Sequence, residues 1–222
     1  MGEWISNMAN LNLWKKQLGV VPESVWDECE IETLILANND LTEVSSRIGR
    51  LQQVRTLDLG HNKLTMIPEE LGEIVGLRDF LYLHDNKLSS LPASLGALKQ
   101  LRYLNISENA FEVLPACVCE MTALVELRAT DNLMESLPEC VGDLRDLREL
   151  HLRNNRLRSL PDSIGRLKEL RQIDLRGNPI VRLPEALLGL PRLDKVDLRW
   201  VSTLVDGGLV VRLRGRGCVV YL

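Results

Sequence analysis

The stretch LRELHLRNNRLRSLPDSIGRLKE, residues 147–169, contains the pattern that decides the fold of this chain. Similar stretches recur along the sequence with an asparagine at a fixed place, and successive asparagines lie 23 or 24 residues apart. These asparagines are Asn39, Asn62, Asn86, Asn109, Asn132, Asn155 and Asn178. A period of this length indicates a solenoid, in which each repeat forms one coil and buries its apolar residues only by stacking on its neighbours.

Each part of the repeat predicts a local structure. The alternating Leu150 and Leu152 predict a short strand whose leucines point inward. The asparagine amide offers donors and an acceptor, so we expect the seven asparagines to form a ladder along the turning backbone of the stacked coils. The proline that follows suits the first position of a short helical turn. Extending the frame by one unit at each end gives about nine repeats, with Lys16 and Val201 in place of the terminal asparagines.

This pattern resembles the leucine-rich repeat. Its LPxxIGxL form is similar to the 23-residue repeats of Ras-pathway scaffold proteins, LAP polarity scaffolds, plant intracellular Ras-group proteins and small bacterial leucine-rich repeat proteins. The resemblance implies an α/β fold: a curved right-handed coil with a parallel sheet on its concave face and short helical or 3-10 turns on its convex face. It also implies that a partner binds on the concave face. We expect one domain over residues 1–222, with an N-terminal cap and degenerate first repeat over 1–30, regular repeats over 31–200 and a C-terminal cap over 201–222.

Composition narrows the function. A net charge of -4 gives no reason to expect nucleic-acid binding, which needs a strongly cationic surface. No apolar run is long enough to span a membrane, and the N-terminus lacks the basic and apolar regions of a secretory signal, so we expect a cytoplasmic protein. Gly2 formally matches a myristoylation pattern. The acidic Glu3 and the bulky Trp4 beside it are unfavourable for acylation, so a plain N-terminal cap is expected.

The five cysteines are expected to be reduced thiols in such a protein. Cys117 and Cys140 each lie two residues after a proline, so stacking should place them on adjacent coils, where a bridging distance is conceivable but, without an oxidising compartment, no disulfide is expected. The repeat register places Cys117 toward solvent on the convex side. Cys119 takes the position of the repeat glycine, at the edge of the core.

Catalytic motifs are absent from the sequence: there is no phosphate-binding glycine loop, no nucleophile elbow and no HExxH zinc motif. We therefore expect neither catalysis nor a cofactor. His61 and His84 should lie close together with Asp58 and Asp85, but a flat open sheet lacks the surrounding groups that normally enclose and orient metal ligands, so no metal is expected. The chain is interpreted as a monomeric, non-catalytic interaction module or scaffold. The alternative is a regulatory or substrate-recognition subunit of an enzyme.

Outward-facing strand positions supply the candidate partner-binding residues. In a parallel, in-register sheet the same position of successive repeats forms a column, with neighbours about 4.8 Å apart. Counted back from each asparagine, these positions hold all three histidines and several aromatic and basic residues. The candidates on the concave face are His61, Tyr82, His84, Tyr103, Arg128, His151, Arg153, Arg176 and Arg199.

The candidates form two patches. The first is aromatic, around Tyr82 and Tyr103, and aromatic residues commonly anchor protein interfaces. The second is a column of arginines from Arg153 to Arg199. This column could bind an acidic segment of a partner through bidentate contacts, or it could be neutralised by acidic residues two positions earlier, of which Asp174 is one. The sequence leaves both alternatives open.

One repeat, GLRDFLYLHDNKL over residues 76–88, contains one residue too many. Leu81 and Leu83 keep the normal frame, so the extra residue should form a bulge before the strand, among Arg78, Asp79 and Phe80. Phe80 could join the outward aromatic side chains or enter the core in place of a leucine.

Overall fold

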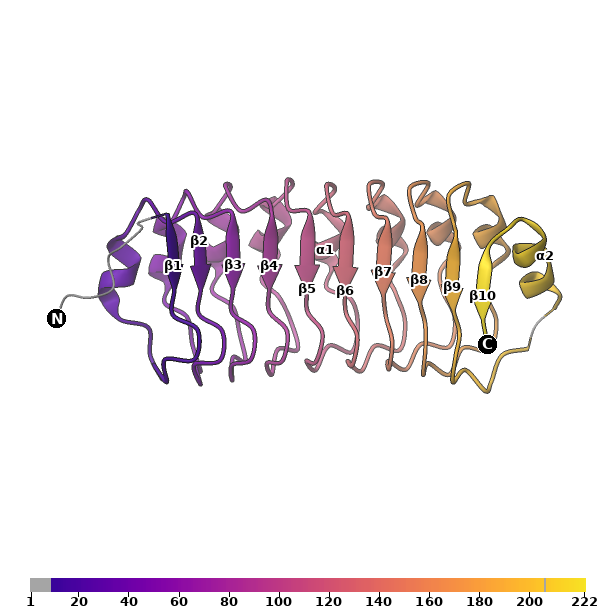
Figure 1. Ribbon diagram of the computed structural model, residues 1–222, viewed down its shortest axis with the longest axis horizontal. Coiled ribbons are helices and arrows are strands. Elements are labelled where there is room, and N and C mark those ends of the chain that lie inside the picture. Colours follow the sequence, from indigo (N-terminus) through magenta and orange to yellow (C-terminus); the bar gives the residue numbers. More distant parts are fainter. Residues whose placement is uncertain (1–8, 206) are drawn as a thin grey trace.

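The computed structural model describes residues 9–205 and 207–222, which form a stack of similar coils with a single ten-stranded parallel sheet (Figure 1). The strands follow one another along the sheet in chain order. They are β1 (Asn10–Asn12), β2 (Thr33–Ile35), β3 (Thr56–Asp58), β4 (Phe80–Tyr82), β5 (Tyr103–Asn105), β6 (Glu126–Arg128), β7 (Glu149–His151), β8 (Gln172–Asp174), β9 (Lys195–Asp197) and β10 (Val219–Tyr221). The leucine-rich repeat solenoid predicted from the sequence is thereby confirmed.

Short helical turns lie behind the sheet in Figure 1 and return the chain from one strand to the next. They are η1 (Glu23–Asp27), η2 (Ser46–Arg50), η3 (Glu69–Glu73), η4 (Ala93–Ala97), α1 (Ala116–Cys119), η5 (Glu139–Asp143), η6 (Asp162–Arg166), η7 (Glu185–Gly189) and α2 (Leu209–Gly215). A proline is the N-cap of every turn except η2 and α2, because its fixed φ suits the start of a helix. Ser45 caps η2 instead, and its side chain accepts a hydrogen bond from the backbone N–H of Arg47. Within the described residues, no helix is long and apolar enough to cross a membrane.

The core is a column of aliphatic side chains that runs through all the coils. Parallel pairing joins equivalent positions, so Leu57, Leu81 and Leu104 lie side by side and are fully buried. The hydrophobic effect therefore acts mainly between neighbouring coils, which explains why a single coil would not fold alone.

The asparagine ladder is built from the same bonds in successive coils. The Nδ2 of Asn155 donates to the carbonyl oxygens of Ala129 (2.8 Å), Leu152 (3.0 Å) and Arg153 (3.4 Å). Its Oδ1 accepts from the backbone N–H of Met134 at 3.0 Å. One buried side chain thus satisfies backbone groups of its own coil and of the coil before it.

The residue before each ladder asparagine has a left-handed backbone, which the sequence did not predict. His61, Asp85 and Asn154 have φ values of 52°, 49° and 53°, and Gly177 occupies the same place with φ 67°. Asn, Asp, His and Gly tolerate this region better than most residues. Trp200 also adopts it, with φ 64°, at the end of the regular repeats.

Cys119 and Cys140 form a disulfide, so the expectation that the five cysteines are reduced thiols is wrong. The bond joins Cys140 to Cys119 and not to Cys117, the cysteine that its place after a proline had brought within conceivable reach. The glycine of each LPxxIGxL phrase faces the following coil, where it meets the second residue after the proline. For example, a Cβ built on Gly142 would lie 2.9 Å from the Cβ of Ser163, which is two residues after Pro161. Cys119 takes that glycine position and therefore faces Cys140, with their Cα atoms 5.6 Å apart. Cys117 is buried rather than exposed, and burial raises the pKa of its thiol to about 11.

The two ends of the stack are closed differently. The C-terminal tail, expected only to cover the core, forms α2 and then β10, which pairs with β9 and makes the tenth strand. At the other end Trp26 is buried, as a cap requires, whereas Trp14 is exposed. Gly2 and Trp4 lie outside the described residues.

Candidate functional site

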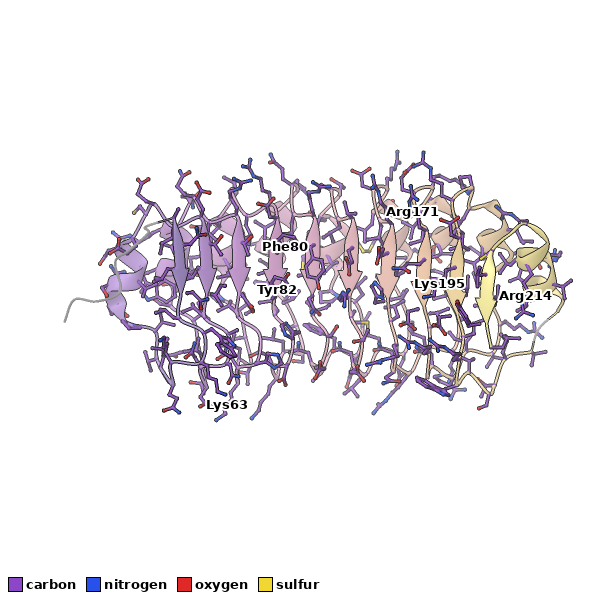
Figure 2. All side chains as sticks on the ribbon, viewed as in Figure 1. Lys63, Phe80, Tyr82, Arg171, Lys195 and Arg214 are labelled. Carbon is purple, nitrogen blue, oxygen red and sulfur yellow. A yellow bond between two sulfur atoms is a disulfide. The ribbon has the colours of Figure 1, made fainter. Side chains whose placement is uncertain are left out.

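The open sheet face, meaning the surface formed by the first and third residues of the strands, carries the candidate residues. In β4 the central Leu81 is buried, while the flanking Phe80 and Tyr82 are exposed or half-buried. Figure 2 shows these two side chains in front of the strands, on the side away from the helical turns. Phe80 is 42% exposed, which settles its direction: it points outward and not into the core.

An aromatic patch, consisting of Phe80, Tyr82, His84 and Tyr103, lies on β4, on β5 and just after β4. The ring centroids of Tyr82 and Tyr103 are 5.0 Å apart, and those of Phe80 and Tyr103 are 5.4 Å apart. Phe80 and Tyr82 stack at 6.0 Å, and Tyr82 meets His84 edge-on at the same distance. These separations are typical of favourable aromatic pairs, so the four rings form one continuous surface.

The extra residue of this repeat lies beside the aromatic patch. The backbone N–H of Asp79 donates to Arg55 on one side, while the carbonyl of Arg78 accepts from Arg102 on the other, both at 2.9 Å. Two residues therefore occupy the place of one. Phe80 still pairs in register, so this bulge changes the approach to the strand without shifting its face.

A shallow hollow of about 290 Å³ opens at the edge of the patch. Its lining residues are Asp79, Phe80, Arg102, Tyr103, Val125 and Glu126. The bulge residue Asp79 supplies part of the wall, so the irregular repeat and the hollow are one feature. The volume lies at the lower end of the range for small-molecule sites and suits one inserted side chain.

The patch carries no charge of its own near neutral pH. Burial raises the pKa of Tyr103 to about 12, an effect that Arg128 opposes and Glu126 reinforces. Burial also lowers the pKa of His84, and the neighbouring His61 lowers it further. Both rings are therefore neutral at pH 7, and the patch offers apolar faces with hydroxyl and imidazole edges.

One member of the patch, His84, is paired with His61 at the edge of the patch. The Nε2 atoms of His61 and His84 lie 3.2 Å apart, and the Nδ1 of His61 lies 2.6 Å from a carboxylate oxygen of Asp85. Gly60 makes room for this pair, because a Cβ at that position would lie 2.4 Å from the ring of His84. Asp58, which the sequence also placed near these histidines, accepts a hydrogen bond from the backbone N–H of Gly60.

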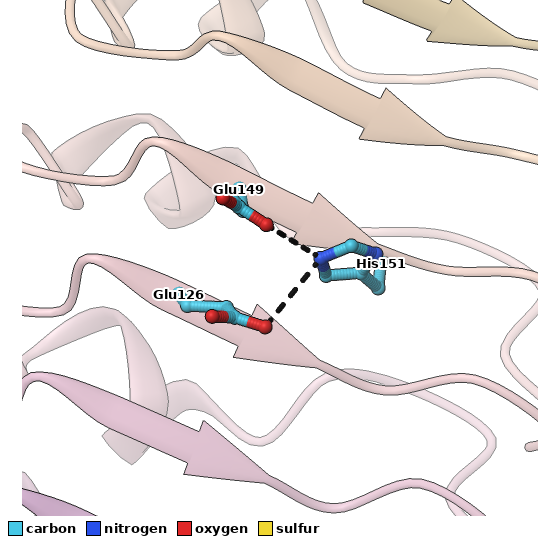
Figure 3. A group of neighbouring side chains, drawn as sticks. All are labelled: Glu126, Glu149 and His151. Carbon is cyan, nitrogen blue, oxygen red and sulfur yellow. Dashed lines mark hydrogen bonds and ion pairs between the residues drawn. The ribbon is translucent and has the colours of Figure 1, made fainter.

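A second cluster brings together Glu126 from β6 with Glu149 and His151 from β7 (Figure 3). The Nε2 of His151 lies 3.2 Å from Glu149 Oε2 and 3.6 Å from Glu126 Oε1. These three ligand atoms all lie within 4.8 Å of one another. Only His151 of these three was a candidate from the sequence, because the convergence depends on side-chain directions that the repeat pattern does not contain.

The arginine column is already paired with carboxylates. Arg176 donates to both oxygens of Asp174, with Nε–Oδ1 at 2.9 Å and a terminal nitrogen at 2.6 Å from Oδ2. Arg199 pairs with Asp197 in the same way, at 3.0 and 2.7 Å. Arg153 contacts Asp131 at 3.1 Å. This geometry favours the self-neutralised alternative.

Asp197 lies at the centre of this network and is almost completely buried. Burial alone would raise the pKa of its carboxyl, but the hydrogen bonds and charge of Arg199 outweigh burial and hold the pKa below its usual value. The carboxylate is therefore ionised at neutral pH and firmly attached to its arginines.

Comparison with known families agrees with this architecture. A leucine-rich repeat model matches residues 29–88 and 140–200, and a model of a leucine-rich repeat region matches residues 69–153. The chain therefore belongs to the leucine-rich repeat family, whose members generally mediate protein–protein interactions.

Among solved structures, the chain is similar to the leucine-rich repeat protein LIC12759 of Leptospira interrogans, with 25% sequence identity and a TM-score of 0.74. The match covers 96% of this chain and 66% of that protein, so the chain spans slightly less than two thirds of its length. Comparison with curated proteins finds no match.

Proposed function

We propose that this chain is a non-catalytic protein-binding module and that the aromatic patch anchors its partner. The observation that carries the proposal is the outward stacking of Phe80, Tyr82 and Tyr103 on an exposed sheet. A parallel sheet packed on one side does not need large aromatic rings on its other side in order to fold. Rigid aromatic side chains lose little entropy on binding, and they dominate the energetics of many protein interfaces.

The hollow beside the patch supports a more specific model of the partner. It is large enough for one bulky apolar side chain, and its rim carries the charged Asp79, Arg102 and Glu126. A partner segment that inserts one such side chain and places polar groups of both signs around it would fit this surface. We place the arginine column at the edge of the interface rather than at its centre, because its guanidinium groups already have partners.

The repeat pattern is consistent with this role. Spacing of 23 residues and the LPxxIGxL phrase support placing the chain beside the scaffold type of leucine-rich repeat protein. Scaffolds of this type use the concave surface of the solenoid for binding.

The test is affinity capture with the immobilised full chain, read by quantitative mass spectrometry. Tyr82→Ala/Tyr103→Ala should reduce capture of the specific partner at least about 30-fold, the loss expected when interface anchors are truncated. Met66→Ala/Val75→Ala is the matched control, because both residues are exposed and apolar but lie outside the strands. Circular dichroism checks that each variant is folded.

A third variant, Arg153→Gln/Arg176→Gln, separates the two patches. Retained capture supports the aromatic patch as the anchor. Loss of capture in this variant alone would show that the partner binds the arginine column. Unchanged capture in every variant would refute binding on this face.

A further inference from the structure

Glu126, Glu149 and His151 bring three ligand atoms of metal-binding type to one point on the open sheet face (Figure 3). Parallel pairing places Glu126 directly beside Glu149, and the strand period of two places His151 on the same face as Glu149. From this convergence we propose that the cluster is a binding site for a divalent transition-metal ion of the zinc class.

The distances from His151 to the two carboxylates fit a single ion, and the ligand atoms all lie within 4.8 Å of one another. Nε2 of His151 lies 3.2 Å from Glu149 Oε2 and 3.6 Å from Glu126 Oε1. Nitrogen and oxygen ligands bound to zinc at about 2.0–2.2 Å lie about 3.0–3.6 Å from one another. An ion in front of the three atoms would therefore contact all of them after only small side-chain movements, and water would complete its coordination.

Electrostatics also favour a cation at this place. Two carboxylates directly opposite each other in neighbouring strands repel one another. The side chains of Glu126 and Glu149 are 22% and 38% exposed, so water screens this repulsion less than it would between fully exposed side chains. A divalent cation would neutralise both carboxylates at once.

Neighbouring groups hold the ligands in place. The side-chain amide of Gln172, on the next strand, donates to Glu149 Oε2. Nε of Arg128 lies 2.6 Å from Glu126 Oε1. Both contacts fall on the oxygens that face His151. Gln172 is neutral, and a carboxylate oxygen has more than one lone pair, so Glu149 Oε2 can keep this hydrogen bond while it binds an ion. Arg128 carries a positive charge, so it competes with the ion and has to move aside when the ion binds.

Zinc is the probe that matches the donor set. An imidazole nitrogen combined with carboxylate oxygens suits zinc and its neighbours in the first transition row better than magnesium or calcium, which prefer oxygen alone. The pair His61–His84 offers only two nitrogen ligands, and His61 is 48% exposed. That pair therefore serves as a control for nonspecific binding to surface histidines.

The experiment is a zinc titration of the full chain by isothermal titration calorimetry, in the Cys29→Ser background so that the exposed thiol does not bind the ion. We expect one zinc ion per chain. His151→Ala and Glu126→Gln/Glu149→Gln should each weaken binding at least about 10-fold. His61→Ala/His84→Ala should leave the affinity unchanged.

Arg128→Gln distinguishes a metal site from a purely structural ion cluster. It should tighten zinc binding, because the competing guanidinium is removed while both carboxylates and the imidazole remain. Cobalt provides a second readout: its visible spectrum should show nitrogen and oxygen ligands without a sulfur charge-transfer band. The proposal is overturned if the wild type binds no zinc, if His151→Ala binds zinc as tightly as the wild type, or if Arg128→Gln binds it more weakly.

Discussion

In each regular coil, a single asparagine side chain forms hydrogen bonds with several backbone groups. Asn155 donates to three carbonyl groups and accepts from one backbone N–H, and it is 5% exposed. A residue without an amide at this place leaves those groups unsatisfied in a dry environment, where each unmade hydrogen bond is costly.

Replacement of Asn155 by alanine should therefore lower the free energy of unfolding by about 3 kcal/mol. Urea denaturation followed by circular dichroism measures this loss. Gln53→Ala is the control, since Gln53 is exposed, and it should change stability by less than about 0.5 kcal/mol. Equal stability of the two variants would show that water replaces the ladder without cost.

Individual residues differ in how far the sequence predicts their structure. The ladder asparagines follow directly from their regular spacing. The outward direction of Phe80 could not be predicted, because the inserted residue shifts either the ring or the backbone and only packing decides which. The left-handed backbone at His61 and Asp85 was not predicted either, although Asn, Asp, His and Gly, which tolerate it, fill most of that column.

At the scale of the element, the helical turns pack against one another through a glycine position. A Cβ on Gly72 would lie 2.3 Å from the carbonyl oxygen of Ser94 in the next turn, so the close approach of these turns requires glycine. Cys119 occupies the equivalent position between α1 and η5. Its side chain fits there because its sulfur is bonded to that of Cys140.

Loss of this disulfide should destabilise the chain. The bond closes a loop with a sequence separation of 21, for which the restriction of the unfolded chain contributes about 3 kcal/mol. Cys140→Ser should therefore lower the urea midpoint under non-reducing conditions, and a thiol reductant should lower the wild-type midpoint by a similar amount. Cys29→Ser, which removes an exposed free thiol, should have no effect. A wild-type chain with five titratable thiols in denaturant would contradict the bond.

At the scale of the whole molecule, stability is distributed along the stack. Each coil contacts chiefly the coils before and after it, so the free energy is approximately a sum of local terms and opening of one end need not unfold the other. The C-terminal coil, with α2 and β10, is the cover of the core at one end, and Leu213 in α2 is fully buried.

Leu213→Ala should loosen this end without affecting distant coils. The local loss is expected to be about 2–5 kcal/mol, as for other buried leucines. Hydrogen exchange measured by mass spectrometry should show faster exchange in β9 and β10 and unchanged protection in β4. Val211→Ala, at an exposed position of the same helix, is the control. Uniform loss of protection in every strand would show that the stack unfolds as one unit.

The sequence by itself determined the coil, the order and register of the strands, the aliphatic core and the asparagine ladder. These features are periodic, so the same pattern occurs in every regular repeat, and an irregular repeat can be interpreted from its neighbours. Only the tertiary structure decided which cysteines pair, where Phe80 points, that the arginines are bound by aspartates, and that Glu126, Glu149 and His151 converge. Those outcomes depend on side-chain directions and on the offset between neighbouring coils. The order of residues along the repeats specifies neither of these, because both are set by packing in three dimensions.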